Sequence, residues 1–127
     1  LDPIPDSALI NGIGQFHCSL RENCSFYRTS IGRGQRKRFR IINTSVYARF
    51  TIGIVDHLMR IIEVDGISLD GNEYVQTLRL SPGQRYSILI EGKSNPSSSS
   101  YWIYSQIHPF VDYNQVYNTS IQSTVFA

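Results

Sequence analysis

Long apolar runs are missing from this sequence. No stretch of its 127 residues approaches the roughly 20 consecutive apolar residues that cross a bilayer. Helical stripes with capping residues are missing as well, so helices are not the expected secondary structure. The chain opens on Leu1-Asp2-Pro3, without an initiating Met, a basic leader or a signal-like apolar region. We therefore expect an excised or processed piece of a longer product, with any targeting information outside it.

Several familiar catalytic motifs are also missing. There is no Gly-x-Ser-x-Gly, no phosphate-binding P-loop and no His-Glu-x-x-His pair. The stretch at residues 32–34 (GRG) is too short to cradle a phosphate and is expected to make a turn. His57, within residues 56–59 (DHLM), is expected in a hairpin rather than as a ligand or base. By itself, the chain does not have the sequence of an enzyme.

The composition is that of one globular domain. Hydrophobic residues make up 41% of the sequence and charged residues 17%, and a chain of this length can bury one sizeable core. We therefore expect a single domain over residues 1–127. The net charge is only +2. Arg36, Arg38 and Arg40 alternate with Phe39 and Ile41, which predicts a strand with a solvated face rather than a nucleic-acid surface.

Strand-like alternation dominates the chain. Apolar and polar residues alternate over residues 50–54, 77–80 and 86–91, with many β-branched and aromatic side chains. Residues typical of turns fall between these runs, as at 65–66 (DG) and 81–83 (SPG). Several short strands at roughly ten-residue spacing predict an all-β Greek-key sandwich or barrel.

Cysteines and glycosylation motifs indicate the compartment. Cys18 and Cys24 are close enough in sequence to close a short disulfide loop, and Asn23, Asn43 and Asn118 each begin an Asn-x-Ser/Thr glycosylation motif. Together these features favour an oxidising, secretory environment and a secreted or cell-surface protein. The alternative is a cytosolic domain with two unpaired thiols.

Three pieces in a fixed order carry a family resemblance. They are residues 5–12 (PDSALING), 38–43 (RFRIIN) and 62–66 (IEVDG). In this order they resemble the middle cupredoxin domain of three-domain multicopper oxidases, the class of fungal laccases and ferroxidases. The resemblance predicts a cupredoxin-like sandwich.

Further motifs extend the resemblance over most of the chain, from about Ile4 to Gln106. Residues 56–59 (DHLM) are similar to the Asp-Gly-His-x-Met turn of these domains. Residues 80–86 (LSPGQRY) and 101–103 (YWI) are close to the family's Gly-Gln-Arg-Tyr and Tyr-Trp-Ile strands. Each also has a structural role, because Pro-Gly favours a turn and Trp is a large apolar anchor.

The resemblance implies copper in the neighbouring domains and none in this one. In such oxidases the first and third domains hold the coppers, which pass electrons from a reducing substrate to dioxygen and form water. A blue-copper centre needs two imidazoles and a thiolate, and no cysteine follows Cys24. His17 and Cys18 are neighbours, and neighbours on a strand point to opposite faces. We expect no metal site within this chain.

The resemblance also implies that the middle domain forms part of the substrate pocket. Asp6 matches a laccase carboxylate that accepts a hydrogen bond or proton from a phenol or aryl amine. Asp2, before Pro-Ile-Pro, takes the place of a Glu that helps to hold ferrous iron in yeast-type ferroxidases. Phe110, with His108 beside it, is the candidate for an apolar ring against the substrate. Each of these residues can also have an ordinary role in a turn, the surface or the core.

Three hypotheses follow. The first is a copper-free central domain that spaces two flanking cupredoxin domains and lines a pocket for a phenol or ferrous iron. The second is a stand-alone, copper-free β-sandwich that binds a partner or ligand. The third, a copper-loaded electron carrier, predicts an intense blue colour with cupric ion, which we do not expect.

Overall fold

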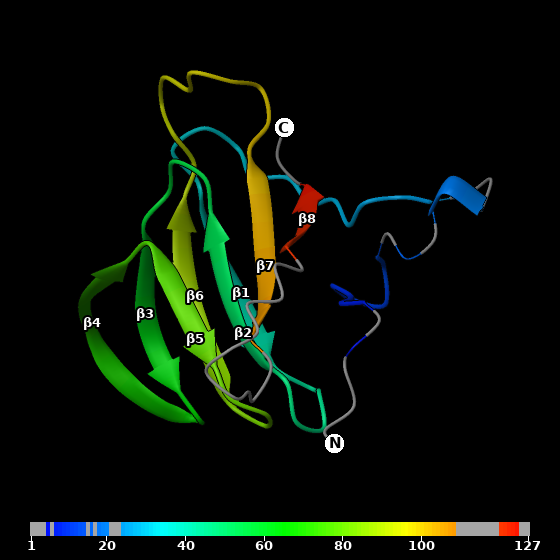
Figure 1. Cartoon of the computed structure of the whole chain (residues 1–127). Helices are drawn as coiled ribbons and strands as arrows, with labels where there is room; N and C mark the ends of the chain where they lie inside the picture. Colours follow the sequence, from blue (N-terminus) through cyan, green and yellow to red (C-terminus); the bar gives the residue numbers. More distant parts are fainter. Residues whose placement is uncertain are drawn as a thin grey trace.

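The computed structural model describes residues 5, 7–14, 16, 18–20, 24–108 and 120–124. Of Ser19, His108 and residues 120–124 it describes the backbone alone. Within these residues the chain forms one short 3-10 turn and eight strands (Figure 1). Their order is η1 (Cys18–Leu20), β1 (Arg36–Ile42), β2 (Arg49–Ile54), β3 (Met59–Val64), β4 (Ile67–Val75), β5 (Thr77–Leu80), β6 (Arg85–Glu91), β7 (Trp102–His108) and β8 (Ser120–Thr124).

The strands form two antiparallel four-stranded sheets. One has the order β1-β6-β3-β4 and the other β5-β2-β7-β8. The chain crosses between the sheets after β1, β2, β4, β5 and β6, so strands that are neighbours in sequence often lie in different layers. The predicted all-β sandwich is confirmed. No helix in the described part of the chain has the length and apolar character that a membrane span requires.

Alternation along β1 places its arginines on the outer face. Arg36, Arg38 and Arg40 are exposed, whereas the residues between them are partly buried. Arg36 lies 3.4 Å from Glu91, and Arg38 lies 3.3 Å from Glu63 on β3. Such exposed pairs stabilise a fold only slightly. The predicted solvated face is therefore present.

The core lies between the two inner faces. Met59, Ile88 and Ile90 are fully buried, and the core around them consists of large aliphatic side chains with one tyrosine. The buried members of this main core are Ile54, Met59, Ile61, Leu78, Leu80, Ile88, Ile90, Tyr101 and Ile103. A second, smaller cluster joins Ala8 of the N-terminal segment to Ala48 and Ile107. Packing of this kind removes apolar surface from water and is the main stabilising contribution to such a sandwich.

Candidate functional site

A cavity of about 670 Å³ opens between the sheets, next to the N-terminal segment. This volume lies in the range of small-molecule pockets. Apolar side chains from the inner faces of β1 and β2, among them Phe39, Ile41, Phe50 and Ile52, form much of its wall, and these four are only partly buried. Residues 7–12 form the wall on another side. The cavity therefore lies where the two sheets do not fully close on each other.

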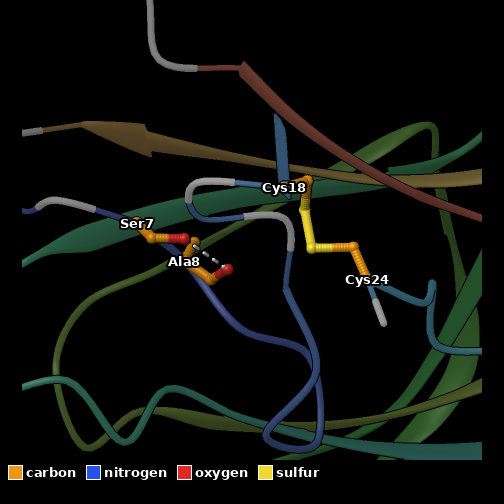
Figure 2. Close-up of a disulfide and its surroundings, with 4 residues drawn as sticks. All are labelled: Ser7, Ala8, Cys18 and Cys24. Carbon is orange, nitrogen blue, oxygen red and sulfur yellow. Dashed lines mark hydrogen bonds between the residues drawn. A yellow bond between two sulfur atoms is a disulfide. The ribbon is translucent and has the colours of Figure 1, made fainter. Parts of the chain in front are cut away.

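Local packing fixes the N-terminal wall. Ala8 is buried against Ala48 and Ile107, and the hydroxyl of Ser7 donates to the carbonyl of Ala8 at 3.3 Å (Figure 2). Gly14 passes close to the same carbonyl, because a Cβ at this position would lie 2.6 Å from the oxygen of Ala8. A glycine is therefore needed where this segment folds back on itself.

The disulfide joins Cys18 of η1 to Cys24, with their Cα atoms 5.5 Å apart (Figure 2). Both cysteines of the sequence are used in this bond. The structure thus forms the pair that the sequence suggested. Because a thiolate is required to ligate copper in a blue-copper centre, the bond leaves the chain without such a ligand.

Asn43 is one of the polar residues on the cavity wall, and its side chain is buried and fully hydrogen-bonded. Its Nδ2 donates to the carbonyls of Ala48 and Leu80 at 2.9 and 3.0 Å. Its Oδ1 accepts from the backbone N–H and the hydroxyl of Ser45 at 3.0 and 2.7 Å. A glycan is attached through Nδ2, and in the folded domain this nitrogen is buried and donates to two carbonyls. Glycosylation of Asn43 stays a prediction from the sequence motif.

His57 lies in the turn between β2 and β3. The expected hairpin is wrong, because these two strands belong to different sheets and do not pair. Its backbone N–H donates to the carbonyl of Ile54, and its Nδ1 lies 2.9 Å from the carbonyl oxygen of Val55. The imidazole packs edge-on against the ring of Tyr101, with the centroids 4.8 Å apart. These contacts give the ring a structural role at this end of the sandwich.

The hydroxyl of Tyr101 is hydrogen-bonded to the neighbouring loop. It lies 3.3 Å from the hydroxyl of Ser97 and accepts from the backbone N–H of Ser98 at 3.2 Å. The ammonium group of Lys93 lies over the ring, 5.2 Å from its centroid. The Ser97 hydroxyl, followed by the Ser98 amide and the charge of Lys93, lowers the pKa of Tyr101, although burial of the ring acts in the opposite direction.

The residues that the structure describes do not fit a resident copper ion. The described part of the chain contains no group of three His, Cys, Asp or Glu side chains that could hold a metal. Both sulfurs are in the disulfide, and His57 is packed against Tyr101. His17 lies outside the described residues.

Most of the predicted pocket and glycosylation residues cannot be placed. Asp2, Asp6 and Phe110 lie outside the described residues, as do the glycosylation candidates Asn23 and Asn118. For His108 the backbone alone is described: it ends β7 and pairs with Arg49 of β2. Sequence reasoning missed the cavity, because alternation predicts which side chains point inward but not whether the sheets close over them.

Comparisons with known proteins agree with the fold. The sequence matches the multicopper oxidase family over residues 1–125. It is 38% identical over 103 residues to Laccase-4 of Thanatephorus cucumeris and 37% identical over 99 residues to Laccase-5 of Trametes villosa. These matches cover 81% and 78% of this chain, and 18% of each laccase.

Solved structures show the same sandwich. A mutant laccase from B. aclada matches 92% of this chain with a TM-score of 0.72 and 23% identity. Fet3p, a multicopper oxidase that functions in iron import, matches 83% with a TM-score of 0.68 and 20% identity. The matched regions are 22% and 20% of those chains. The chain thus spans about a fifth of its relatives, and it belongs to the multicopper oxidase family.

Proposed function

We propose that this chain is the copper-free central domain of a secreted, laccase-type multicopper oxidase. The family match over residues 1–125 and the laccases at 38% and 37% identity support the oxidase assignment. The disulfide supports the secretory compartment. In this role the chain spaces two copper-bearing domains. The whole enzyme oxidises phenols, aryl amines or ferrous iron and reduces dioxygen to water.

The disulfide is the observation that carries the copper-free assignment. It uses the two cysteines of the sequence, and a cupredoxin copper centre requires a cysteine thiolate. Incubation of the purified chain with cupric ion, followed by elemental analysis and absorption spectroscopy, tests this assignment. We expect neither stoichiometric copper nor an intense blue band. Stoichiometric copper bound by His17, His57 or His108 would overturn it and identify an electron carrier.

Exposed apolar side chains support a domain that docks against neighbours. Val46, Leu20 and Ile67 are 93%, 79% and 69% exposed, and in the proposed role flanking domains cover such side chains. We expect the isolated chain to self-associate on gel filtration. A stand-alone binding module, the alternative function, predicts a monodisperse monomer instead.

The second proposed role is to form part of the substrate pocket. Asp6 directly precedes residues 7–12, which line the cavity. Its carboxylate is proposed to accept a hydrogen bond or proton from a phenol or aryl amine as that substrate loses an electron. Asp2 is the corresponding candidate for ferrous iron, which prefers hard oxygen ligands. Phe110 and His108 are proposed to contact the substrate ring.

Oxygen uptake by the parent oxidase distinguishes the two substrates. If Asp6 accepts the proton, Asp6→Asn lowers kcat/KM for a substituted phenol by about a hundredfold, the lower end of a general-base contribution, and leaves the value for ferrous iron unchanged. If Asp2 binds iron, Asp2→Asn lowers kcat/KM for ferrous iron and leaves the value for the phenol unchanged. Asp70→Asn, at an exposed carboxylate on β4, is the matched control. Equal losses in all three variants contradict both assignments.

A further inference from the structure

The N-terminal wall contains a tight two-residue turn formed by Asn11 and Gly12. The N–H of Ile10 donates to the carbonyl of Ile13 at 2.9 Å, and the N–H of Ile13 donates back at 3.0 Å. Both central residues have positive φ, 50° at Asn11 and 77° at Gly12. These are the features of a type I′ turn, in which Asn-Gly is the preferred pair.

In this turn, neither the carboxamide of Asn11 nor the backbone N–H of Gly12 is buried or hydrogen-bonded to a residue that the structure describes. Asn11 and Gly12 are exposed, and no heavy atom beyond the two neighbouring residues lies within 4 Å of the place where a side chain at Gly12 would begin. Among the described residues, none accepts a hydrogen bond from the Gly12 N–H or from the carboxamide of Asn11. The carboxamide of Asn11 and the following peptide nitrogen are therefore both open to water.

We propose that Asn11 is a site of spontaneous deamidation. The peptide nitrogen of Gly12, after losing its proton, attacks Cγ of Asn11, and the Cγ–N bond of the carboxamide breaks to release ammonia. The resulting five-membered succinimide is opened by water. Opening at the side-chain carbonyl gives aspartate, whereas opening at the main-chain carbonyl gives isoaspartate. No oxidant or metal is needed.

Three other residues with related chemistry are held in place or sterically hindered. The carboxamide of Asn43 is buried and makes four hydrogen bonds. Asp65 also precedes a glycine, but its carboxylate accepts the N–H of Arg85 at 2.9 Å and lies 3.6 Å from the Arg85 guanidinium. Asn72 is exposed and precedes Glu73, whose side chain hinders the attacking nitrogen. Asn11 is the only asparagine of the sequence that precedes a glycine.

The modification changes the wall of the cavity. Isoaspartate adds one carbon to the main chain between Ile10 and Ile13, so their two mutual hydrogen bonds cannot both keep their geometry. Ile10 packs against the main core. Either product also places a negative charge on the segment that lines the cavity. Deamidation of the folded protein therefore weakens the packing of residues 7–12 and adds a negative charge to them.

Incubation of the folded protein in mildly alkaline and mildly acidic buffer, followed by peptide mapping that resolves aspartate from isoaspartate, tests the proposal. We expect Asn11 to convert about ten times faster than Asn72, because glycine leaves its nitrogen unhindered, and to convert faster in alkali. Asn11→Asp is the control. Aspartate tolerates a positive φ, so this variant keeps the turn, and it shows no mass change at position 11 because it has no amide to lose.

A second variant separates the chemistry from folding. Gly12→Ala slows the conversion of Asn11 in the folded protein and also in the same protein unfolded in urea, so its effect does not depend on a stable fold. Conversion of Asn11 at the rate of Asn72 in the folded protein, together with rapid conversion in urea, would overturn the proposal and show that the turn protects this residue.

Discussion

The carboxamide of Asn43 donates a hydrogen bond to the carbonyl of Leu80, which is 37 residues away in sequence, at 3.0 Å. Asn43 follows β1 of one sheet, and Leu80 ends β5 of the other. A second bond, from the same nitrogen to Ala48, fixes the chain before β2. One buried side chain thus ties the two sheets together beside the cavity.

Replacing this side chain is expected to be costly. Asn43→Ala removes the side-chain donor to the carbonyl of Leu80 and the acceptor of the Ser45 N–H, and each unsatisfied buried group costs about 1–3 kcal/mol. The carbonyl of Ala48 keeps the hydroxyl of Ser45 as a donor. We predict that the free energy of unfolding in urea falls by about 2–4 kcal/mol. Asn72→Ala, at an exposed asparagine, is the control and is expected to change stability by less than about 0.5 kcal/mol. Similar losses in both variants would contradict the role of Asn43.

Burial of the Asn43 side chain also predicts that this glycosylation motif carries no glycan. In glycoprotein secreted from a eukaryotic host, we expect peptide mass spectrometry to find Asn43 without a glycan, because its Nδ2 is already bonded to two carbonyls. Asn23 and Asn118, whose surroundings are not described, provide the internal comparison. A glycan on Asn43 in folded, secreted protein would show that this part of the structure is wrong.

Gly92 is required for the close approach of two loops. A Cβ at this position would collide with the carbonyl oxygen of Gly32, and the backbone of Gly92 pairs with Gly34 and Gln35 at 2.8 Å each. Gly92→Ala is predicted to destabilise the domain by about 1–3 kcal/mol, as overpacking does. Gly34→Ala has open space but a φ of 66°, so its cost is about 1 kcal/mol. Thermal unfolding that ranks Gly34→Ala as the worse variant would contradict this account.

The phenol of Tyr101 is predicted to ionise at a lower pH than an ordinary tyrosine. Hydrogen bonds from the Ser97 hydroxyl and the Ser98 amide stabilise the phenolate and lower its pKa. The resulting stabilisation is absent at neutral pH, begins as the pH rises through the lowered pKa and is complete above the usual value near 10.

Ultraviolet difference spectra during alkaline titration check the Tyr101 prediction. Tyr101→Phe should remove the earliest-titrating phenolate, whereas Tyr74→Phe, at an exposed tyrosine, should retain it. Ser97→Ala should return the pKa of Tyr101 towards its ordinary value. An early phenolate that persists in Tyr101→Phe would assign it to another tyrosine.

The disulfide is predicted to contribute modest stability. Replacing both Cys18 and Cys24 by serine removes the constraint on a short loop, which is worth about 2 kcal/mol on the chain-entropy scale. Reduction of the unchanged protein should cause a similar loss in urea unfolding. The same reductant should have no effect on the double variant, and any effect there would point to a cause other than this bond.

The sequence carried more information about the fold than about the site. Alternation at Arg36, Phe39 and Arg40 predicted the two faces of β1, and the structure has them. At Asn43 the local pattern gave only a glycosylation motif, because such a motif is read from three residues and does not reveal that the side chain is buried. Asp6 and Phe110 remain predictions, since both lie outside the described residues.

The sequence by itself determined the strand-forming runs and the positions of the turns between them, and it suggested the pairing of its two cysteines, because these depend on residues near one another in the chain. Only the tertiary structure decided that Asn43 meets Leu80 and that Phe39 and Phe50 line a cavity instead of closing it. Those contacts depend on how the two sheets lie against each other. Pairing between distant strands sets that arrangement, and the pattern within a single strand does not encode it.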